Sequence, residues 1–361
     1  MFEVEDNFIL LHHKMDEKRN VWFIVNPISG TTDKKNIVEM IPKYMDAEKF
    51  SCEIFYTSHK GHAAEISAKA IEQNVDVVVA VGGDGTVNEV AKSLVHTNTA
   101  LGIIPCGSGN GLARHLFIPM NPEKALKVIS EFDIRSLDYG LINGTPFFCT
   151  CGVGFDAFVS SKFATSGKRG LLSYIENTLR EGLKYKPDTY EIEIEGEKQT
   201  HKAFLIACAN ASQYGNNVYI APEASMSDGL MDVTIMEPFT MLEAPQIAIQ
   251  LFNKNITQNS RIKTFKCRQM VIHRSAPGVI HFDGDPKDEG ADIVVELVPQ
   301  DIKIVVNNKE QEQLPPLLRV FSDVYNGMND EFNNLRQDLL QRQEKFRTIN
   351  KDLLKRLKPQ K

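Results

Sequence analysis

An apolar run that ends in a glycine cluster constrains the fold of this chain more than any other feature. Residues 75–81 are rich in valine, which is typical of a parallel strand buried on both faces. Gly82-Gly83-Asp84-Gly85-Thr86 follows directly, and residues 87–94 have helical spacing. The glycines permit a sharp turn close to a ligand, and the N-terminus of the helix favours an anion such as a nucleotide phosphate. A carboxylate there repels phosphate unless it holds a metal or takes a proton, so Asp84 is predicted to take part in the chemistry.

The composition restricts the class of protein. A chain of 361 residues can form two domains with sizeable cores. Its formal net charge of −6 argues against a nucleic-acid partner. The six cysteines show no C-x-x-C spacing, which favours a reduced, cytoplasmic setting. The sequence has neither a signal-peptide pattern nor an apolar run of roughly eighteen residues, so we expect no transmembrane segment and only peripheral contact with a membrane.

Strands and helices alternate in the first part of the chain. We expect a short N-terminal tail over residues 1–20 and an α/β domain over residues 21–140. The predicted strands are 21–25, 52–56, 75–81 and 101–104, and the predicted helices are 35–45, 63–73 and 87–94. This alternation is typical of a parallel sheet that binds a ligand at the carboxyl ends of its strands.

The pattern changes at about residue 141. Short alternating strands separated by turn residues predict a mostly antiparallel β-sandwich over residues 141–313, with a helical insertion at 171–183. The predicted strands are 147–151, 190–195, 203–209, 231–236, 270–273 and 293–298. A cleft between the two domains is the expected place for a ligand.

The last part of the chain follows Pro315-Pro316. Residues 314–361 carry apolar residues spaced three and four apart and end in a basic stretch, which predicts a helical, coiled-coil-like tail. Two roles stay open for it. The tail packs on the body or pairs two chains as a homodimer, or its basic end contacts anionic lipid at a membrane surface.

Three loops at successive strand ends could meet at one ligand. Besides the glycine turn, these are Asn26-Pro27-Ile28-Ser29-Gly30 and the Pro-Cys-Gly-Ser-Gly-Asn-Gly-Leu-Ala-Arg segment at residues 105–114. One glycine turn is usually only a connection, but three in succession, one with an acid and two with asparagine, predict a nucleotide site. The sequence contains neither the phosphate-loop motif nor the protein-kinase signature set.

In this order the loops resemble those of the diacylglycerol kinase catalytic family, which includes bacterial lipid kinases, sphingosine kinases and ceramide kinases. Further matching motifs lie at residues 152–157, 224–232 and 282–285, so the resemblance covers residues 21–307. It implies transfer of the γ-phosphoryl group of ATP to a lipid hydroxyl, with Mg²⁺. The nucleotide contacts that it implies are Asn26, Pro27, Ser29, Gly30, Thr57, Gly82, Gly83, Asp84, Gly85, Thr86, Asn88, Glu89, Gly109 and Asn110. Arg169, in a turn flanked by glycines, is a candidate phosphate clamp.

Three acids are candidates for the catalytic base. Asp283 and Asp285 would face the same side of an extended strand but diverge in a tight Asp-Gly-Asp turn. Two close carboxylates can separate their proton affinities, which leaves one able to accept a proton from the lipid hydroxyl. The family usually has Asp-Gly-Glu there, with the acid after the glycine as proton acceptor. Asp84 is the rival, because sphingosine-type members are described with that acid as the base.

The resemblance also implies a metal site and an acceptor site. Ser225, Asp228 and Leu230 match a place where two carbonyls and one carboxylate hold a structural Mg²⁺. Asp138 joins that network through water or lies in a strand-end turn. Gly111 stands where many bacterial members have Asp, as in sphingosine-type members, and Asp156 matches an acid that those members use near the lipid head group.

The leading function is therefore that of a lipid kinase whose acceptor is diacylglycerol or a related lipid. Three alternatives stay open. They are a sphingoid-base or ceramide kinase of the same family, a kinase of soluble substrates like NAD kinase, and a lipid or nucleotide sensor without catalytic activity.

Overall fold

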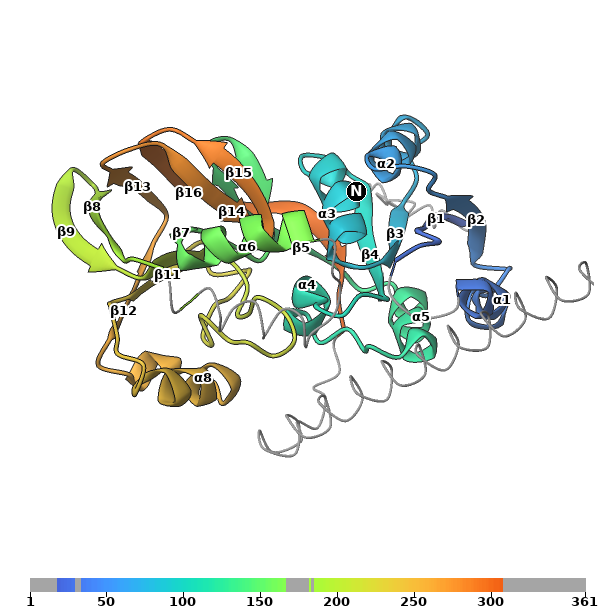
Figure 1. Cartoon of the computed structure of the whole chain (residues 1–361). Helices are drawn as coiled ribbons and strands as arrows, with labels where there is room; N and C mark the ends of the chain where they lie inside the picture. The colour runs from blue at the N-terminus through green and yellow to red at the C-terminus, as the bar shows by residue number, and fades with distance from the viewer. Residues whose placement is uncertain (1–17, 30–33, 167–181, 183–184, 308–361) are drawn as a thin grey trace, which may run out of the picture.

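The computed structural model describes residues 18–29, 34–166, 182 and 185–307. Its first half is an α/β layer in which β2, β1, β3 and β4 form, in that order, an all-parallel sheet. Every residue of β3 and β4 is buried, which explains their continuous apolar sequences. Helices α2 and α3 lie side by side on one face, and α1 and α5 lie on the other (Figure 1). The elements are β1 (Arg19–Val25), α1 (Lys34–Tyr44), β2 (Phe50–Tyr56), α2 (His62–Glu72), β3 (Val77–Gly82), α3 (Asp84–Leu94), β4 (Ala100–Pro105), α4 (Gly111–His115) and α5 (Pro122–Glu131).

The second half is a sandwich of two mostly antiparallel sheets, as the sequence predicted. One sheet has the order β12-β11-β10-β7-β14-β15, and the other continues the parallel sheet through β4-β16-β13-β8-β9. Between them lies a core of alternating apolar residues such as Ile206, Val233 and Ile272. The elements are β5 (Ile134–Ile142), β6 (Thr145–Phe147), β7 (Thr150–Gly154), α6 (Phe155–Ser166), β8 (Asp188–Ile194), β9 (Glu197–Ala203), β10 (Leu205–Ala209), β11 (Met231–Met236), α8 (Ala244–Phe252), the 3₁₀ turn η1 (Ile256–Gln258), β12 (Ile262–Cys267), β13 (Gln269–Arg274), β14 (Gly278–Phe282), β15 (Asp285–Glu289) and β16 (Asp292–Val305).

A single long strand joins the two halves. β16 pairs in parallel with β4 at one end and antiparallel with β13 at the other, and β5 runs along it. The division expected at residue 140 falls inside β5. The parallel sheet and one sheet of the sandwich are therefore one continuous sheet. This continuity fixes the position of the parallel sheet relative to the sandwich.

Four predictions need comment. The single strand expected at residues 147–151 is wrong: β6 and β7 are separate, because the N–H groups of Phe148 and Cys149 turn aside to Asp283. The described residues include only residue 182 of the helical insertion predicted at 171–183, and they include neither residues 1–17 of the N-terminal tail nor the tail at 314–361. Within the part of the chain that the structure describes, no helix is long and apolar enough to cross a membrane.

Candidate functional site

The three predicted loops meet at the carboxyl edge of the parallel sheet. In the sheet register Val25 lies beside Val81, and Gly82 lies beside Pro105. Asn26 follows β1, its N–H donates to the carbonyl of Val81, and its Nδ2 donates to Thr86 Oγ1 at 3.0 Å. Thr57 follows β2 and donates its N–H to the carbonyl of Val25. Parallel pairing thus brings together residues that are far apart in the sequence.

The second and third loops touch through their glycines. A Cβ on Gly83 would lie 3.3 Å from Gly107 Cα, and a Cβ on Gly107 would lie 2.8 Å from Gly83 Cα. Around Gly85, by contrast, a Cβ would meet no atom of the described residues within 4 Å. The backbones therefore pack directly on each other, while the first turn of α3 stays open on the side of Gly85. The N-cap residue of α3 is Gly83, and no side chain among the described residues caps the helix.

Asp84 connects these two loops. Its Oδ2 accepts the N–H of Asn110 and its Oδ1 accepts the N–H of Gly111, both at 2.9 Å. A Cβ on Gly109 would lie only 2.7 Å from Asp84 Oδ2, so a larger residue at that position would displace the carboxylate. The sequence analysis expected this carboxylate to hold a metal or to take a proton. In the structure backbone N–H donors from the third loop stabilise its charge instead.

The asparagines and Glu89 shape the loops from within. Asn110 is buried, has a left-handed backbone, and its side chain forms hydrogen bonds with both the N–H and the carbonyl of Gly107. Asn88 is also buried, on the inner face of α3. Glu89 accepts the N–H of Gly61 at the start of α2, at 3.1 Å. In the described structure Glu89 therefore joins α3 to the start of α2, and Asn110 fixes the shape of its own loop.

The sequence analysis missed a lysine at this edge. Lys34, the first residue of α1, is 7% exposed, and its Nζ donates to the carbonyl of Ser29 in the first loop. Burial raises the pKa of the Cys106 thiol at the start of the third loop, and the charge of Lys34 opposes this effect without outweighing it. The sequence analysis could not identify this lysine, because Lys34 belongs to no recognised motif. Its place beside the first loop depends on where α1 begins.

The two acids near the end of the chain diverge. Residues 282–285 form a tight turn between β14 and β15, with left-handed backbone at Asp283 and Gly284. Asp283 Oδ1 accepts the N–H groups of Cys149 and Thr150, and its Oδ2 accepts that of Phe148, at 2.7–3.1 Å. Asp285 is exposed, and among the described residues its carboxylate has no hydrogen-bond or ion-pair partner.

The charges of Asp283 and Asp84 both act on one buried cysteine. Burial raises the pKa of the Cys149 thiol well above its usual value, and the charges of Asp283 and then Asp84 raise it further. A Cβ on Gly111 would lie 3.4 Å from Cys149 Sγ. Residues 148–150 therefore connect the Asp-Gly-Asp turn with the third loop: they donate to Asp283, and Cys149 lies beside Gly111. Burial also raises the pKa of Asp283, against the opposite effect of its three backbone donors.

A further buried cluster lies next to this segment. Asp156 at the start of α6 accepts the hydroxyl proton of Tyr214 at 3.0 Å and lies 2.9 Å from His281 Nε2. The Asp156 side chain is 10% exposed and that of His281 is 2% exposed. Because the carboxylate accepts, Nε2 carries the proton, and His281 Nδ1 is buried without a partner among the described atoms. The carbonyl of Tyr214 would lie 3.4 Å from a Cβ on Gly111, which places this cluster beside the third loop.

Comparison with known proteins agrees with this arrangement. Residues 20–142 match the diacylglycerol kinase catalytic domain, and residues 149–306 match the YegS C-terminal NAD kinase beta sandwich-like domain. The chain belongs to the diacylglycerol kinase catalytic family. Membership identifies it as a lipid kinase at the level of general activity, with ATP as the phosphoryl donor.

Named relatives agree with the assignment. A diacylglycerol kinase of Bacillus subtilis is 27% identical over 272 residues, which cover 73% of this chain and 88% of that protein. A probable lipid kinase YegS-like of Chromohalobacter salexigens is 32% identical, over 54% of this chain and 64% of that protein. The crystal structure of a diacylglycerol kinase from Bacillus anthracis shares the fold with a TM-score of 0.65 at 22% identity, over 81% of this chain and 98% of that one.

In the loop for which the family resemblance implied a structural Mg²⁺, the carboxylate of Asp228 already has two partners. Asp228 Oδ2 lies 2.8 Å from Lys266 Nζ, and its Oδ1 accepts the N–H of Leu230 at 3.1 Å. The Ser225 hydroxyl bonds to Ser227. In the described ranges, no three His, Cys, Asp or Glu side chains are grouped so that they could hold a metal ion. The one carboxylate of this loop thus has a lysine where a cation would bind.

Two candidate residues, Gly30 and Arg169, lie outside the described residues.

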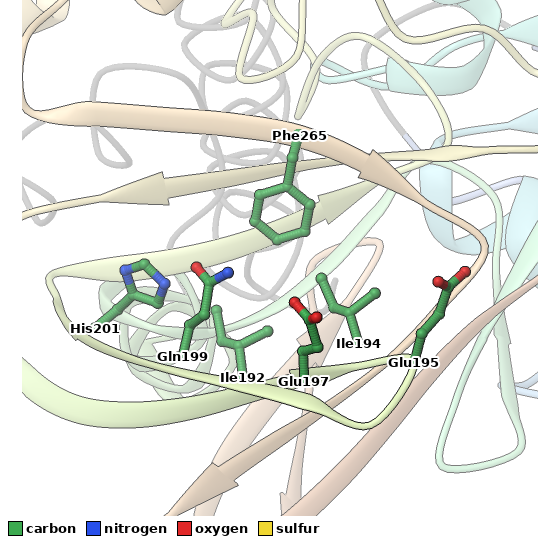
Figure 2. Close-up of a pocket in the computed structure, with 7 residues that line it drawn as sticks. All are labelled: Ile192, Ile194, Glu195, Glu197, Gln199, His201 and Phe265. Atoms are coloured by element: carbon green, nitrogen blue, oxygen red, sulfur yellow. The ribbon is translucent and has the colours of Figure 1, made fainter.

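A pocket of about 340 Å³ lies at the far end of the sandwich, where Phe265 of β12 faces β8 and β9 (Figure 2). Glu195 and Glu197 line it, and it shares no residue with the glycine loops. Its carboxylates would repel phosphate, which disfavours this pocket as the nucleotide site.

Proposed function

We propose that the chain transfers the γ-phosphoryl group of ATP to the hydroxyl of a lipid such as diacylglycerol. The observation that carries this proposal is the open first turn of α3, held against the third loop by Asp84. Phosphoryl transfer depends mostly on positioning and on neutralising charge, and these loops serve both.

The nucleotide would lie along the carboxyl edge of the sheet. The uncapped N-terminus of α3 offers backbone N–H groups and a positive dipole end to the phosphates. Lys34 adds a cation beside the first loop. When bound, Mg²⁺ would supply charge neutralisation between the phosphates, and Asp84 is the acid of this edge that would hold it. Asn110 and Asp283 would act indirectly, by shaping the loops that meet there.

Asp285 is our choice for the proton acceptor. A base needs a lone pair that the hydroxyl can reach. All the hydrogen bonds that Asp283 accepts come from the backbone, whereas the Asp285 carboxylate is exposed and unpartnered among the described residues. Asp84 remains the rival, because each of its oxygens accepts only one N–H.

The acceptor would enter beside Asp156. This acid lies next to the third loop, and Tyr214 and His281 fix its orientation. The same feature favours a second candidate function, a sphingoid-base kinase, since a buried carboxylate can pair with the amine of such a lipid. The acceptor would be presented at a membrane surface, as a long-chain lipid requires.

The test is γ-phosphoryl transfer from labelled ATP, with Mg²⁺, to lipids in mixed micelles. The panel holds diacylglycerol, phosphatidylglycerol, a sphingoid base, ceramide and, as the soluble control, NAD. Label in diacylglycerol supports the leading function, and label in the sphingoid base supports the second. Label in NAD alone, or in nothing while ATP still binds, would contradict both.

Variants of β15 test the base. Asp285→Asn should lose at least about a hundredfold in turnover with ATP binding retained, as expected for removal of a general base. Asp288→Asn is the matched control, since Asp288 is exposed on the same strand. Full activity of Asp285→Asn would transfer the role to Asp84, for which Asp84→Asn is the test.

A further inference from the structure

The loop between Ile220 and β11 is built around a lysine. Lys266 Nζ lies 2.8 Å from Asp228 Oδ2 and 3.1 Å from Asp232 Oδ2. Lys266 and Asp232 are directly opposite in the antiparallel pairing of β12 with β11. The sheet register therefore fixes where the ammonium group lies, because directly opposed side chains on one face are neighbours.

The two carboxylates differ in how far they are buried. The Asp232 side chain is only 16% exposed, and that of Asp228 is 33% exposed. The negative charge of the less exposed Asp232 needs compensation, and the Lys266 ammonium group lies within hydrogen-bond reach of it.

One ammonium group faces both acids. It supplies donors to both carboxylates at once, as a bound cation would.

A divalent ion and this ammonium cannot occupy the place together. Asp228 Oδ2 faces Lys266, and Asp228 Oδ1 faces the N–H of Leu230. Mg²⁺ needs close to six oxygens in octahedral geometry, and a second cation a few ångströms from the first would be repelled. A metal would have to displace Lys266.

We propose that Lys266 is the resident cation of this loop, in the place of a divalent ion, so that the loop is held in its conformation without metal. This proposal is independent of the proposed function, since it concerns the folded chain without nucleotide. It replaces the Mg²⁺ site that the family resemblance implied for Ser225, Asp228 and Leu230.

The experiment is thermal unfolding of the nucleotide-free chain in a chelator and in millimolar Mg²⁺. The wild type should unfold at the same temperature in both. Lys266→Met should unfold about 3–6 °C lower in the chelator, because it leaves two acids unpaired. Mg²⁺ should then raise its Tm, since a ligand that binds only the folded state stabilises it.

Two variants serve as controls. Lys263→Met removes another lysine of β12, which pairs with Glu237 at 2.7 Å. It should change the Tm little and should not respond to Mg²⁺. Lys266→Arg keeps the positive charge and should have the same Tm as the wild type, with and without Mg²⁺. If Lys266→Met does not fold, the Lys266→Arg variant still tests whether a cation at this position makes Mg²⁺ unnecessary.

Two outcomes would overturn the proposal. One is a wild-type Tm that rises with Mg²⁺ and loses the rise in Asp228→Asn, because the metal would then bind despite the lysine. The other is a Lys266→Met variant whose Tm is the same with and without Mg²⁺, since the vacated place would then not be a cation site.

Discussion

The Asp-Gly-Asp turn offers a sharp test, because the structure gives its two acids different roles. Asp283 accepts three backbone N–H groups from residues 148–150, whereas Asp285 is exposed. A hydrogen bond to a charged group stabilises by about 1.5–3 kcal/mol. In Asp283→Asn the side-chain amide would face the N–H of Phe148 or those of Cys149 and Thr150, so at least one donor loses its partner.

The expected loss is near the lower end of that range. Burial already disfavours the charged form of Asp283, as its raised pKa shows, so the neutral side chain avoids part of the cost of burying the carboxylate. We therefore expect a decrease of about 2 kcal/mol in the free energy of unfolding and of about 4–8 °C in Tm. Asp285→Asn should leave the Tm within about 1 °C of the wild type, as is usual for an exposed residue.

The assay is thermal unfolding of both variants beside the phosphoryl-transfer measurement. Asp283→Asn should lose stability and activity together, because residues 148–150 support the third loop through Cys149. Asp285→Asn should lose activity alone. An unchanged Tm for Asp283→Asn, or a Tm for Asp285→Asn that is several degrees lower, would refute the division of roles.

Two more predictions concern the third loop and the helix after it. Gly109→Ala should reduce turnover at least about tenfold, because a Cβ would lie 2.7 Å from Asp84 Oδ2. Gly111→Ala should be tolerated, since its Cβ would meet Cys149, Tyr214 and Gln213 at 3.4–3.5 Å, which is an ordinary contact distance. Equal activities of the two variants would contradict this account of the loop. Burial, and then the charge of Lys254, lowers the pKa of His115 from 6.5 to about 4, and its Nδ1 accepts the N–H of Ser212. Between these two pKa values His115 is protonated in the unfolded chain but neutral in the folded chain. The free energy of unfolding therefore keeps its full value above about pH 6.5 and decreases by up to about 3 kcal/mol as the pH falls to about 4. His115→Gln should show a flatter dependence of Tm on pH over that window, and an unchanged slope would exclude His115 as its cause.

Local patterns predicted the parallel sheet and its loops well. A buried parallel strand is a continuous apolar run, and β3 and β4 both follow that rule, so their positions could be predicted from neighbouring residues alone. The glycine turn after β3 was equally visible. Its partners were not, because Asp84 receives its hydrogen bonds from residues 26 and 27 positions further along the chain.

Long-range pairing explains what the sequence could not reveal. Residues 292–305 have the alternation of any exposed strand, and nothing local shows that β16 joins two sheets. The Asp-Gly-Asp spacing allowed either of two arrangements, and only the N–H groups of residues 148–150 decide between them. Lys266 lies in no motif, since its role comes from a register with Asp232 across two strands.

Asp138 shows how these long-range contacts depend on one another. Of the two roles expected for it, the strand-end turn is wrong, because Asp138 lies in the middle of β5 and is fully buried. Its Oδ1 accepts the N–H of Gln300 at 2.8 Å, where the register of β16 shifts and the backbone is left-handed. Its Oδ2 accepts the N–H of Gly229 at 2.9 Å, in the loop that Lys266 holds.

This carboxylate therefore secures the strand that joins the two halves and the loop beside it. In Asp138→Asn one of the two donors would face an amide N–H₂, which should cost about 1–3 kcal/mol and lower the Tm by several degrees. Because Lys266 still faces Asp228 and Asp232, the variant should gain no response to Mg²⁺. If Mg²⁺ did raise its Tm, the lysine would need Asp138 to stay in place, and the loop would depend on the bulge in β16 rather than on its own cation.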